Sequence, residues 1–247
     1  MRLLRYRPLW LCTVALAAAM LLAAAPVHAT MVTFTASDFA SNNPPMNASA
    51  TITVNDGSIV VQLTNLEGNL TSAVQEISGI QITLGALSST GTVFLTSATG
   101  TLININSSGS YYNSSGSINH WYSSTSGNTL TLSTDTNDLI IGAPDANNLY
   151  SNSDSSVSNN DPTIQNTATF YLTVANATST TNVTNVVFSF GTGSSDPWLT
   201  GSKSSGEVPE PTSLLMLGTA LLALGVLARG RRSRRASRQA LGQIVAG

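Results

Sequence analysis

The fold class is decided by residues 49–63, which read SATITVNDGSIVVQL. Ile52 and Val54 alternate with threonines before the turn, and apolar side chains alternate again over residues 59–63. Successive side chains of a strand point to opposite faces, so this alternation places one row in a core and the other in solvent. Asn55-Asp56-Gly57 supplies residue types that suit a tight hairpin turn. The stretch therefore predicts a β-hairpin with one buried face.

The same period-two alternation recurs along the chain, without a long helical periodicity between residues 30 and 207. Strands are predicted over 31–37, 49–55, 58–64, 77–86, 92–97, 100–106, 129–133, 138–141, 167–175 and 183–191. Short strands punctuated by turn residues predict a mainly β fold, an antiparallel β-sandwich, as one domain over residues 30–193. Residues 107–127 and 145–161 are predicted as loops, and residues 194–207 as a Gly/Ser linker.

Charge is distributed very unevenly, although the formal net charge is only −2. All nine arginines lie near the two ends of the chain. Residues 30–207 carry eleven acidic side chains and one basic side chain, Lys203, which gives a net charge of −10. A nucleic-acid duplex is bound through Lys and Arg that neutralise phosphates, so no nucleic-acid partner is expected. The distribution also argues against an ordinary cytosolic enzyme.

Residues 1–29 have the pattern of a secretory signal peptide. Three arginines precede an apolar run over residues 9–25, and small residues at the −3 and −1 positions predict cleavage by signal peptidase between Ala29 and Thr30. Cys12, the single cysteine, leaves with this peptide. The mature chain is therefore expected to have no disulfide, thiolate nucleophile or cysteine metal site.

The C-terminal region combines three features in a fixed order. Pro209, Glu210 and Pro211 lie in a motif over residues 208–211, where two prolines prevent a helix. Residues 213–228 are apolar and predict one short transmembrane helix. A helix of this length can still span the bilayer, because flanking arginines can snorkel and the bilayer can thin. An Arg-rich tail follows at 229–238, and by the positive-inside rule it stays in the cytoplasm. The residues expected to stop and anchor the helix are Arg229, Arg231, Arg232, Arg234 and Arg235.

This order of motif, short apolar helix and Arg-rich tail behind a signal peptide resembles the PEP-CTERM sorting signal, over residues 208–238. The resemblance implies export by a Gram-negative bacterium that makes exopolysaccharide, with processing of the tail by an exosortase, a membrane-embedded cysteine transpeptidase-like enzyme. It implies contact with inner-membrane lipid, a periplasmic ectodomain, and a final location at the cell surface or in the extracellular matrix. Residues 80–84, 141–144 and 188–192 are similar to uncharacterised ectodomains joined to such tails, which implies no activity.

Few side chains of the mature domain suit catalysis. His120, its single histidine, has no Gly-x-Ser-x-Gly elbow to serve and is predicted to be a packing residue. Glu67 and Glu76 are the only glutamates before the linker, and spacing selects no acid pair for glycoside hydrolysis. The acidic segments 135–138 and 152–161 carry oxygen ligands that Ca²⁺ prefers, but neither has EF-hand spacing. No catalytic residue, cofactor or metal site is therefore predicted.

Aromatic residues gather in the predicted loop and offer one candidate binding site. The sugar-binding candidates are Tyr111, Tyr112, Trp121 and Tyr122. Flat rings beside Asn and Asp can stack on sugars, although sandwich cores also take Trp and Tyr. Three functions stay open: a surface or matrix protein without catalytic activity, a module that binds carbohydrate such as the exopolysaccharide, and, least favoured, a secreted hydrolase that uses Asp pairs.

Overall fold

The computed structural model describes residues 29–38, 44–85, 87, 89–151, 156–192 and 197–204. The signal peptide apart from Ala29, the Pro-Glu-Pro motif, the transmembrane helix and the Arg-rich tail lie outside the described residues. Within the described ranges, no helix is long and apolar enough to cross a membrane.

The described chain is mainly β and contains thirteen strands with two short 3-10 helices. In chain order the elements are β1 (Thr30–Asp38), β2 (Met46–Asn55), β3 (Ser58–Asn65), η1 (Ala73–Gln75), β4 (Ile77–Leu84), β5 (Val93–Ile105), β6 (Tyr111–Asn113), β7 (Tyr122–Ser126), β8 (Thr129–Ser133), β9 (Ile140–Ile141), η2 (Ser158–Asn160), β10 (Thr163–Val174), β11 (Val183–Phe190), β12 (Trp198–Thr200) and β13 (Ser202–Lys203). The predicted fold class is therefore confirmed at the level of a mainly β chain.

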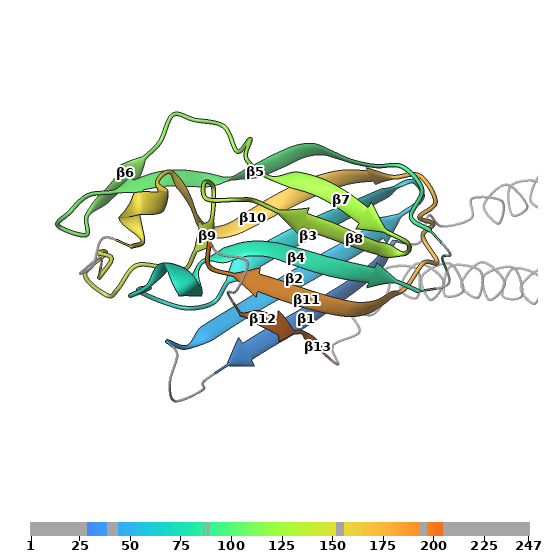
Figure 1. Cartoon of the computed structure of the whole chain (residues 1–247), viewed down its shortest axis with the longest axis horizontal. Coiled ribbons are helices and arrows are strands. Elements are labelled where there is room, and N and C mark those ends of the chain that lie inside the picture. The colour runs from blue at the N-terminus through green and yellow to red at the C-terminus, as the bar shows by residue number, and fades with distance from the viewer. Residues whose placement is uncertain are drawn as a thin grey trace, which may run out of the picture. The chain divides into compact units, whose positions relative to one another are not determined.

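The strands form one hydrogen-bonded path in the order β12-β11-β4-β9-β10-β3-β2-β1-β13. Two branches leave this path: β5 pairs with β10 and carries β6, and β8 pairs with β4 and carries β7. All pairs are antiparallel except β9 with β10, so the sheet is mixed but mostly antiparallel. In Figure 1, β4, β8 and β11 cross in front of β2 and β3.

The stretch at residues 49–63 forms the hairpin that its pattern predicts. Asn55 pairs with Ser58, which leaves Asp56 and Gly57 as a two-residue connection between β2 and β3. Gly57 has φ of 72°, a left-handed conformation that costs glycine little because it has no Cβ. Gly57 also donates its N–H to the carbonyl of Ala177, at 2.9 Å, which ties the turn to the end of β10.

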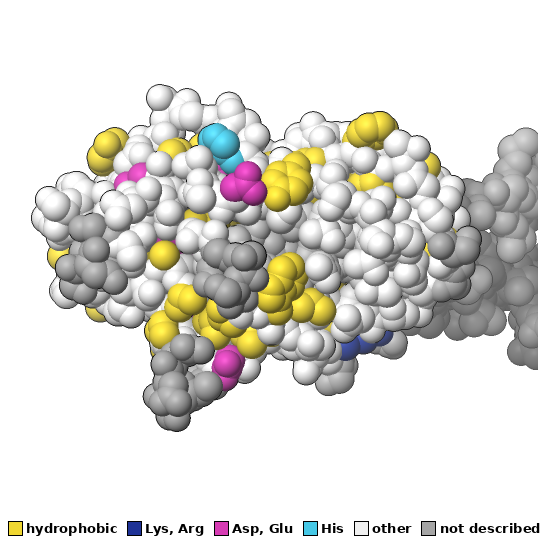
Figure 2. All heavy atoms as spheres, viewed as in Figure 1, with side chains coloured by type: hydrophobic (Ala, Val, Ile, Leu, Met, Phe, Trp, Pro, Cys, Tyr) yellow, Lys and Arg dark blue, Asp and Glu magenta, His cyan; other side chains and the backbone are white. Residues whose placement is uncertain are grey.

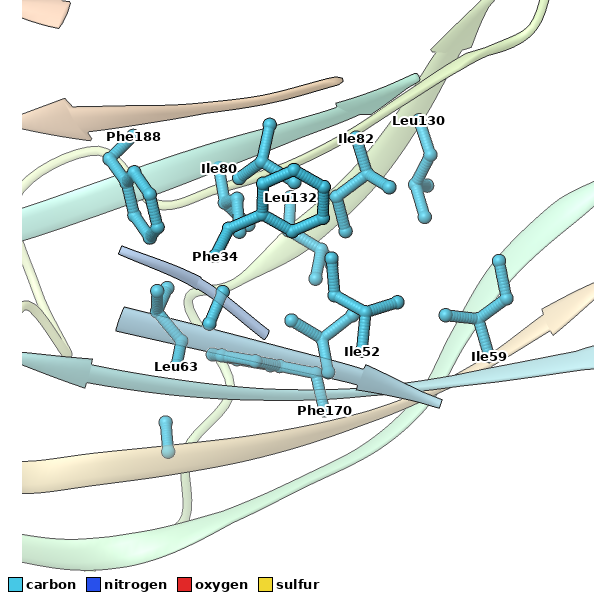
Figure 3. Close-up of a cluster of buried hydrophobic side chains, with 14 of the residues drawn as sticks. Phe34, Ile52, Ile59, Leu63, Ile80, Ile82, Leu130, Leu132, Phe170 and Phe188 are labelled. Carbon is cyan, nitrogen blue, oxygen red and sulfur yellow. The ribbon is translucent and has the colours of Figure 1, made fainter. Parts of the chain in front are cut away.

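The core lies between strands that belong to different stretches of the path. Figure 3 shows Ile80, Ile82 and Leu132 of β4 and β8 opposite Ile52 and Phe170 of β2 and β10. These side chains are completely buried and belong to one hydrophobic cluster. Full burial of each such side chain contributes roughly 1.5–3 kcal/mol before entropy is counted, so this cluster is the main stabilising element.

The largest differences between the structure and the sequence-based assignments lie in three places, besides β9, which forms only the last two residues of the predicted strand 138–141, and β10, which begins four residues before the predicted strand 167–175. The ranges 92–97 and 100–106 form one continuous strand, β5, because shifts in its register with β10 absorb the irregularity. Polar strands β6 and β7 lie in the segment predicted as a loop, and their largely exposed side chains give no apolar alternation to detect.

The segment 194–207, predicted as a Gly/Ser linker, contributes β12 and β13 to the sheet. Leu199 packs against the core, and β12 pairs with β11 while β13 pairs with β1. The two ends of the strand path are therefore joined through Gly201, whose N–H donates to the carbonyl of Val186 at 2.8 Å.

Candidate functional site

Trp121, the central residue of the predicted sugar site, lies in the core. Its side chain is 5% exposed, and its ring centroid lies 4.5 Å from that of Phe170. The indole N–H donates to the backbone oxygen of Asp138 at 2.7 Å, which satisfies the one polar atom of the ring. Trp121 is therefore a packing residue, and its ring face is not available to a sugar.

The three tyrosines of that site lie in separate surroundings. Tyr111 packs edge-on against Tyr150 with centroids 5.4 Å apart, and its hydroxyl donates to Asn148 Oδ1. Tyr112 is exposed on β6, next to the β5 edge. Tyr122 is exposed on β7 and donates its hydroxyl to Asp135 Oδ1 at 3.2 Å. The structure thus divides the predicted cluster, and only Tyr112 and Tyr122 present exposed rings.

His120 is the half-exposed partner of a buried carboxyl group. Its Nδ1 lies 3.0 Å from Asp138 Oδ2, and the side chains are 47% and 1% exposed, respectively. The same Oδ2 accepts the backbone N–H groups of Asn119 and His120, each at 3.0 Å. Among the described residues, no hydroxyl group is hydrogen-bonded to the His120 ring, as the nucleophile of a catalytic triad would be. The hydrogen bonds to Asp138 Oδ2 connect the loop before β7 to the segment before β9.

Two further acidic residues, the buried Glu76 and the partly buried Asp161, were not selected by sequence reasoning. Glu76 Oε2 accepts from Asn160 Nδ2 at 2.9 Å, and Asp161 Oδ2 accepts from the Ile105 N–H at 2.6 Å. Burial raises the pKa of Glu76 well above its usual value, and the nearby Asp161 charge raises it further, against the opposing hydrogen bond from Asn160. Burial also raises the pKa of Asp161, to about 6.

A raised carboxyl pKa is typical of general acids, but enclosure removes Glu76 from that role. Its side chain is completely buried, so no substrate reaches it. Among the described residues, no group of three His, Cys, Asp or Glu side chains is arranged to hold a metal ion. Glu76 and Asp161 therefore connect η1, η2 and β5 as structural groups.

The exposed aromatic residues on strand faces are a second set that sequence reasoning missed. Trp198 of β12 is 48% exposed, while Phe94 of β5 and Tyr171 of β10 are 61% and 42% exposed. The alternation of side chains along β10 indicates that Tyr171 is exposed, because it lies between the inward-facing Phe170 and Leu172. Trp198 lay in the segment predicted as a linker, where no strand face was assigned.

Comparison with known proteins assigns no function to this geometry. The chain matches no protein-family model, and no curated protein or solved structure is significantly similar to it. The functional argument therefore depends on the residues and their arrangement.

Proposed function

We propose that the chain is an exported cell-surface or extracellular-matrix protein without catalytic activity, delivered by a C-terminal PEP-CTERM sorting signal. The supporting observation is where the sheet begins and ends. Strand β1 begins at Thr30, the first residue after the proposed cleavage point, and β13 ends at Lys203, before the motif at residues 208–211. Among the described residues, the sheet thus lies between the two proposed processing signals.

Thr30 itself takes part in the fold. It pairs with Val54 across β1 and β2, and its hydroxyl donates to the Ser179 carbonyl at 2.7 Å. The sheet therefore uses the first residue of the proposed mature chain and, among the described residues, nothing before it. Signal peptidase can act there without removing a strand residue.

The finer fold that we propose for this ectodomain is a β-sandwich. Strands β1, β2, β3, β10 and β5 would form one layer, and β11, β4, β8 and β7 the other. The apolar side chains that meet between these sets support this description (Figure 3). The excess of acidic over basic side chains, −10 over residues 30–207, favours a soluble outward-facing domain that avoids anionic surfaces.

The sorting proposal is tested in an exosortase-producing Gram-negative host with the full chain. One variant replaces Pro209, Glu210 and Pro211 with alanine, and its matched control replaces residues 204–206 with alanine. Intact mass spectrometry should find the unaltered chain and the control starting at Thr30 and shortened within residues 208–247. The motif variant should keep its tail and stay in the inner-membrane fraction. Equal processing and location of all three chains would contradict the proposal.

A further inference from the structure

A row of five residues crosses the outer face formed by β12, β11, β4, β8 and β7. The strand register fixes their order. Trp198 of β12 pairs with Ser189 of β11, which pairs with Gly79 of β4. Gly79 pairs with Ser133 of β8, which pairs with Tyr122 of β7. Cross-strand partners share a face of the sheet, so all five lie on the same side. The two aromatic residues end the row, and three small residues lie between them.

The three residues in the middle of this row have small side chains or none, and the residues at its two ends have large ones. Gly79 is buried and has no side chain, and a Cβ placed on it would lie 3.0 Å from the Leu132 carbonyl oxygen and 3.4 Å from the Cβ atoms of Ser133 and Ser189, so no side chain rises above the sheet at this position. Four interstrand spacings separate Trp198 from Tyr122, a span of about 19 Å. Both aromatic side chains are 48% exposed. The row is therefore a shallow trough with an aromatic ring at each end.

The trough is uncharged. Strands β4, β7, β8, β11 and β12 contain no Asp, Glu, Lys, Arg or His. The next outward row consists of Thr200, Val187, Gln81, Thr131 and Ser124. Asp135 lies at one end, where it accepts the Tyr122 hydroxyl and holds the ring. Figure 2 views this side of the molecule, where uncharged side chains and backbone predominate.

We propose that this trough binds an extended, neutral polysaccharide. Sugar rings have apolar C–H faces that stack on aromatic rings, and their hydroxyl groups hydrogen-bond to Ser, Thr and Gln side chains. An uncharged floor on an acidic domain disfavours polyanions, and the carboxylate at its end, Asp135, already accepts the Tyr122 hydroxyl. Two rings about 19 Å apart, four interstrand spacings, suit a polymer of several sugar units better than a single sugar. The inference rests on the proposed function only in that an exported domain meets such polymers outside the cell.

The outer side of β10 and β5, across the core from the trough, supplies a matched control. Tyr171 lies on β10, opposite Val60 and Ser97, and Phe94 lies opposite the neighbouring Thr173. These two rings are exposed like those of the trough, but they stand at nearby positions on adjacent strands with no small-residue floor between them. They form a single apolar spot, so they are not expected to contact the polymer.

The test uses the full chain, purified in a detergent without a sugar headgroup. Probes are cellulose, chitin and dextran as neutral polysaccharides, with alginate and heparin as charged ones, measured by pull-down and affinity electrophoresis. We expect retention by at least one neutral polymer. Trp198→Ala and Tyr122→Ala should each weaken it at least about tenfold, because ring truncation at an anchor removes much of the binding energy. Phe94→Ala and Tyr171→Ala should leave it within about twofold, and circular dichroism should show all four variants folded.

Several results would overturn the inference. These are no retention by any neutral polymer, stronger retention by alginate or heparin, or retention that is unchanged in both trough variants. A dimer that Trp198→Ala dissociates, without polysaccharide binding, would show that the face pairs with a second copy instead. Because binding is measured on purified protein, its failure is distinct from a failure of export, which is read from processing in cells.

Discussion

Two regions of this sheet are stabilised in different ways. Along β2 and the facing part of β3, inward side chains are apolar and outward ones are mainly Thr, Ser and Gln. Around the two-residue strand β9 the interior is polar instead. The buried polar side chains gathered there are Asn65, Gln75, Glu76, Asp138 and Thr163.

In the polar region, side chains complete backbone hydrogen bonds that long paired strands complete in the apolar region. Asn65 Nδ2 donates to the backbone oxygens of both Gln75 and Ile140, and Asn65 Oδ1 accepts the Glu67 N–H. These bonds satisfy main-chain groups that a strand as short as β9 leaves without a ladder partner. Glu76 Oε1, Asp138 Oδ1 and Thr163 Oγ1 have no hydrogen-bond partner among the described residues. The first region therefore depends on packed apolar volume, and the second depends on completed hydrogen bonds.

The largest effect is expected from a cavity in the apolar region. Phe170→Ala removes a completely buried ring that packs against Trp121. Loss of transfer energy plus the cavity should cost about 3–5 kcal/mol of unfolding free energy. Thermal unfolding of the full chain should show a loss of roughly 10 °C or more. Tyr171→Ala, one residue along and exposed, is the control, and an equal loss there would contradict the assignment of the core.

Asp138→Ala should give the next largest loss. It leaves the partly buried N–H groups of Asn119 and His120 without this acceptor, and it puts alanine at φ of 58°. A destabilisation of about 2–4 kcal/mol is expected.

His120→Ala tests which partner of that pair carries the stability. It removes only a half-exposed ring, so the loss should stay under about 1 kcal/mol. Asp138→Asn, which keeps an acceptor oxygen and tolerates positive φ, should fall between the two. If His120→Ala cost as much as Asp138→Ala in chemical denaturation, the contact between the two side chains and not the capped backbone would be the stabilising element.

The difference between the regions also explains what the sequence could predict. Residues 49–63 predicted a hairpin because alternation and turn chemistry are local, and β1, β2, β3, β4, β8 and β11 were placed on the same grounds. Edge strands β6 and β7 have no buried row, so alternation could not reveal them. The parallel pairing of β9 with β10 depends on contacts distant in sequence.

The site residues were less predictable for a related reason. Trp121 and Tyr122 are adjacent in the sequence, yet one is buried and the other exposed, because they fall on opposite faces as β7 begins. Glu76 and Asp161 are far apart in the sequence, and nothing local marks Glu76 as buried or Asp161 as partly buried. The trough depends on the register of five strands, which composition cannot supply.

Acidification should stabilise the polar region. The pKa of Asp161 is about 6 in the fold, against an ordinary value of 3.8, and that of Glu76 is shifted in the same direction. The folded state therefore holds protons that the unfolded chain releases. Their contribution is fully present below about pH 4 and is lost as pH rises through 6. With partial exposure of Asp161 taken into account, the full chain should unfold about 2–4 °C higher at pH 5 than at pH 7.5, on the order of 1 kcal/mol.

Asp161→Asn tests this assignment directly. The amide oxygen can still accept the Ile105 N–H, but the group no longer titrates. The difference in unfolding temperature between pH 5 and pH 7.5 should shrink, with the main gain at pH 7.5. An unchanged pH dependence in the variant would assign the titration to other groups.

The smallest effects come from one substitution made in both regions, threonine to valine. Thr163 Oγ1 is buried without a partner among the described residues, so Thr163→Val replaces a desolvated hydroxyl with a methyl group of similar shape. It should stabilise the chain by up to about 1 kcal/mol. Thr51 instead shares a hydrogen bond of 3.0 Å with Thr33 on the partly exposed outer face, so Thr51→Val should stay within about 0.5 kcal/mol of zero. Chemical denaturation of both variants measures the difference. If Thr163→Val destabilised the chain, its hydroxyl would have a partner, most simply a buried water, and the polar region would be better satisfied than its protein contacts indicate.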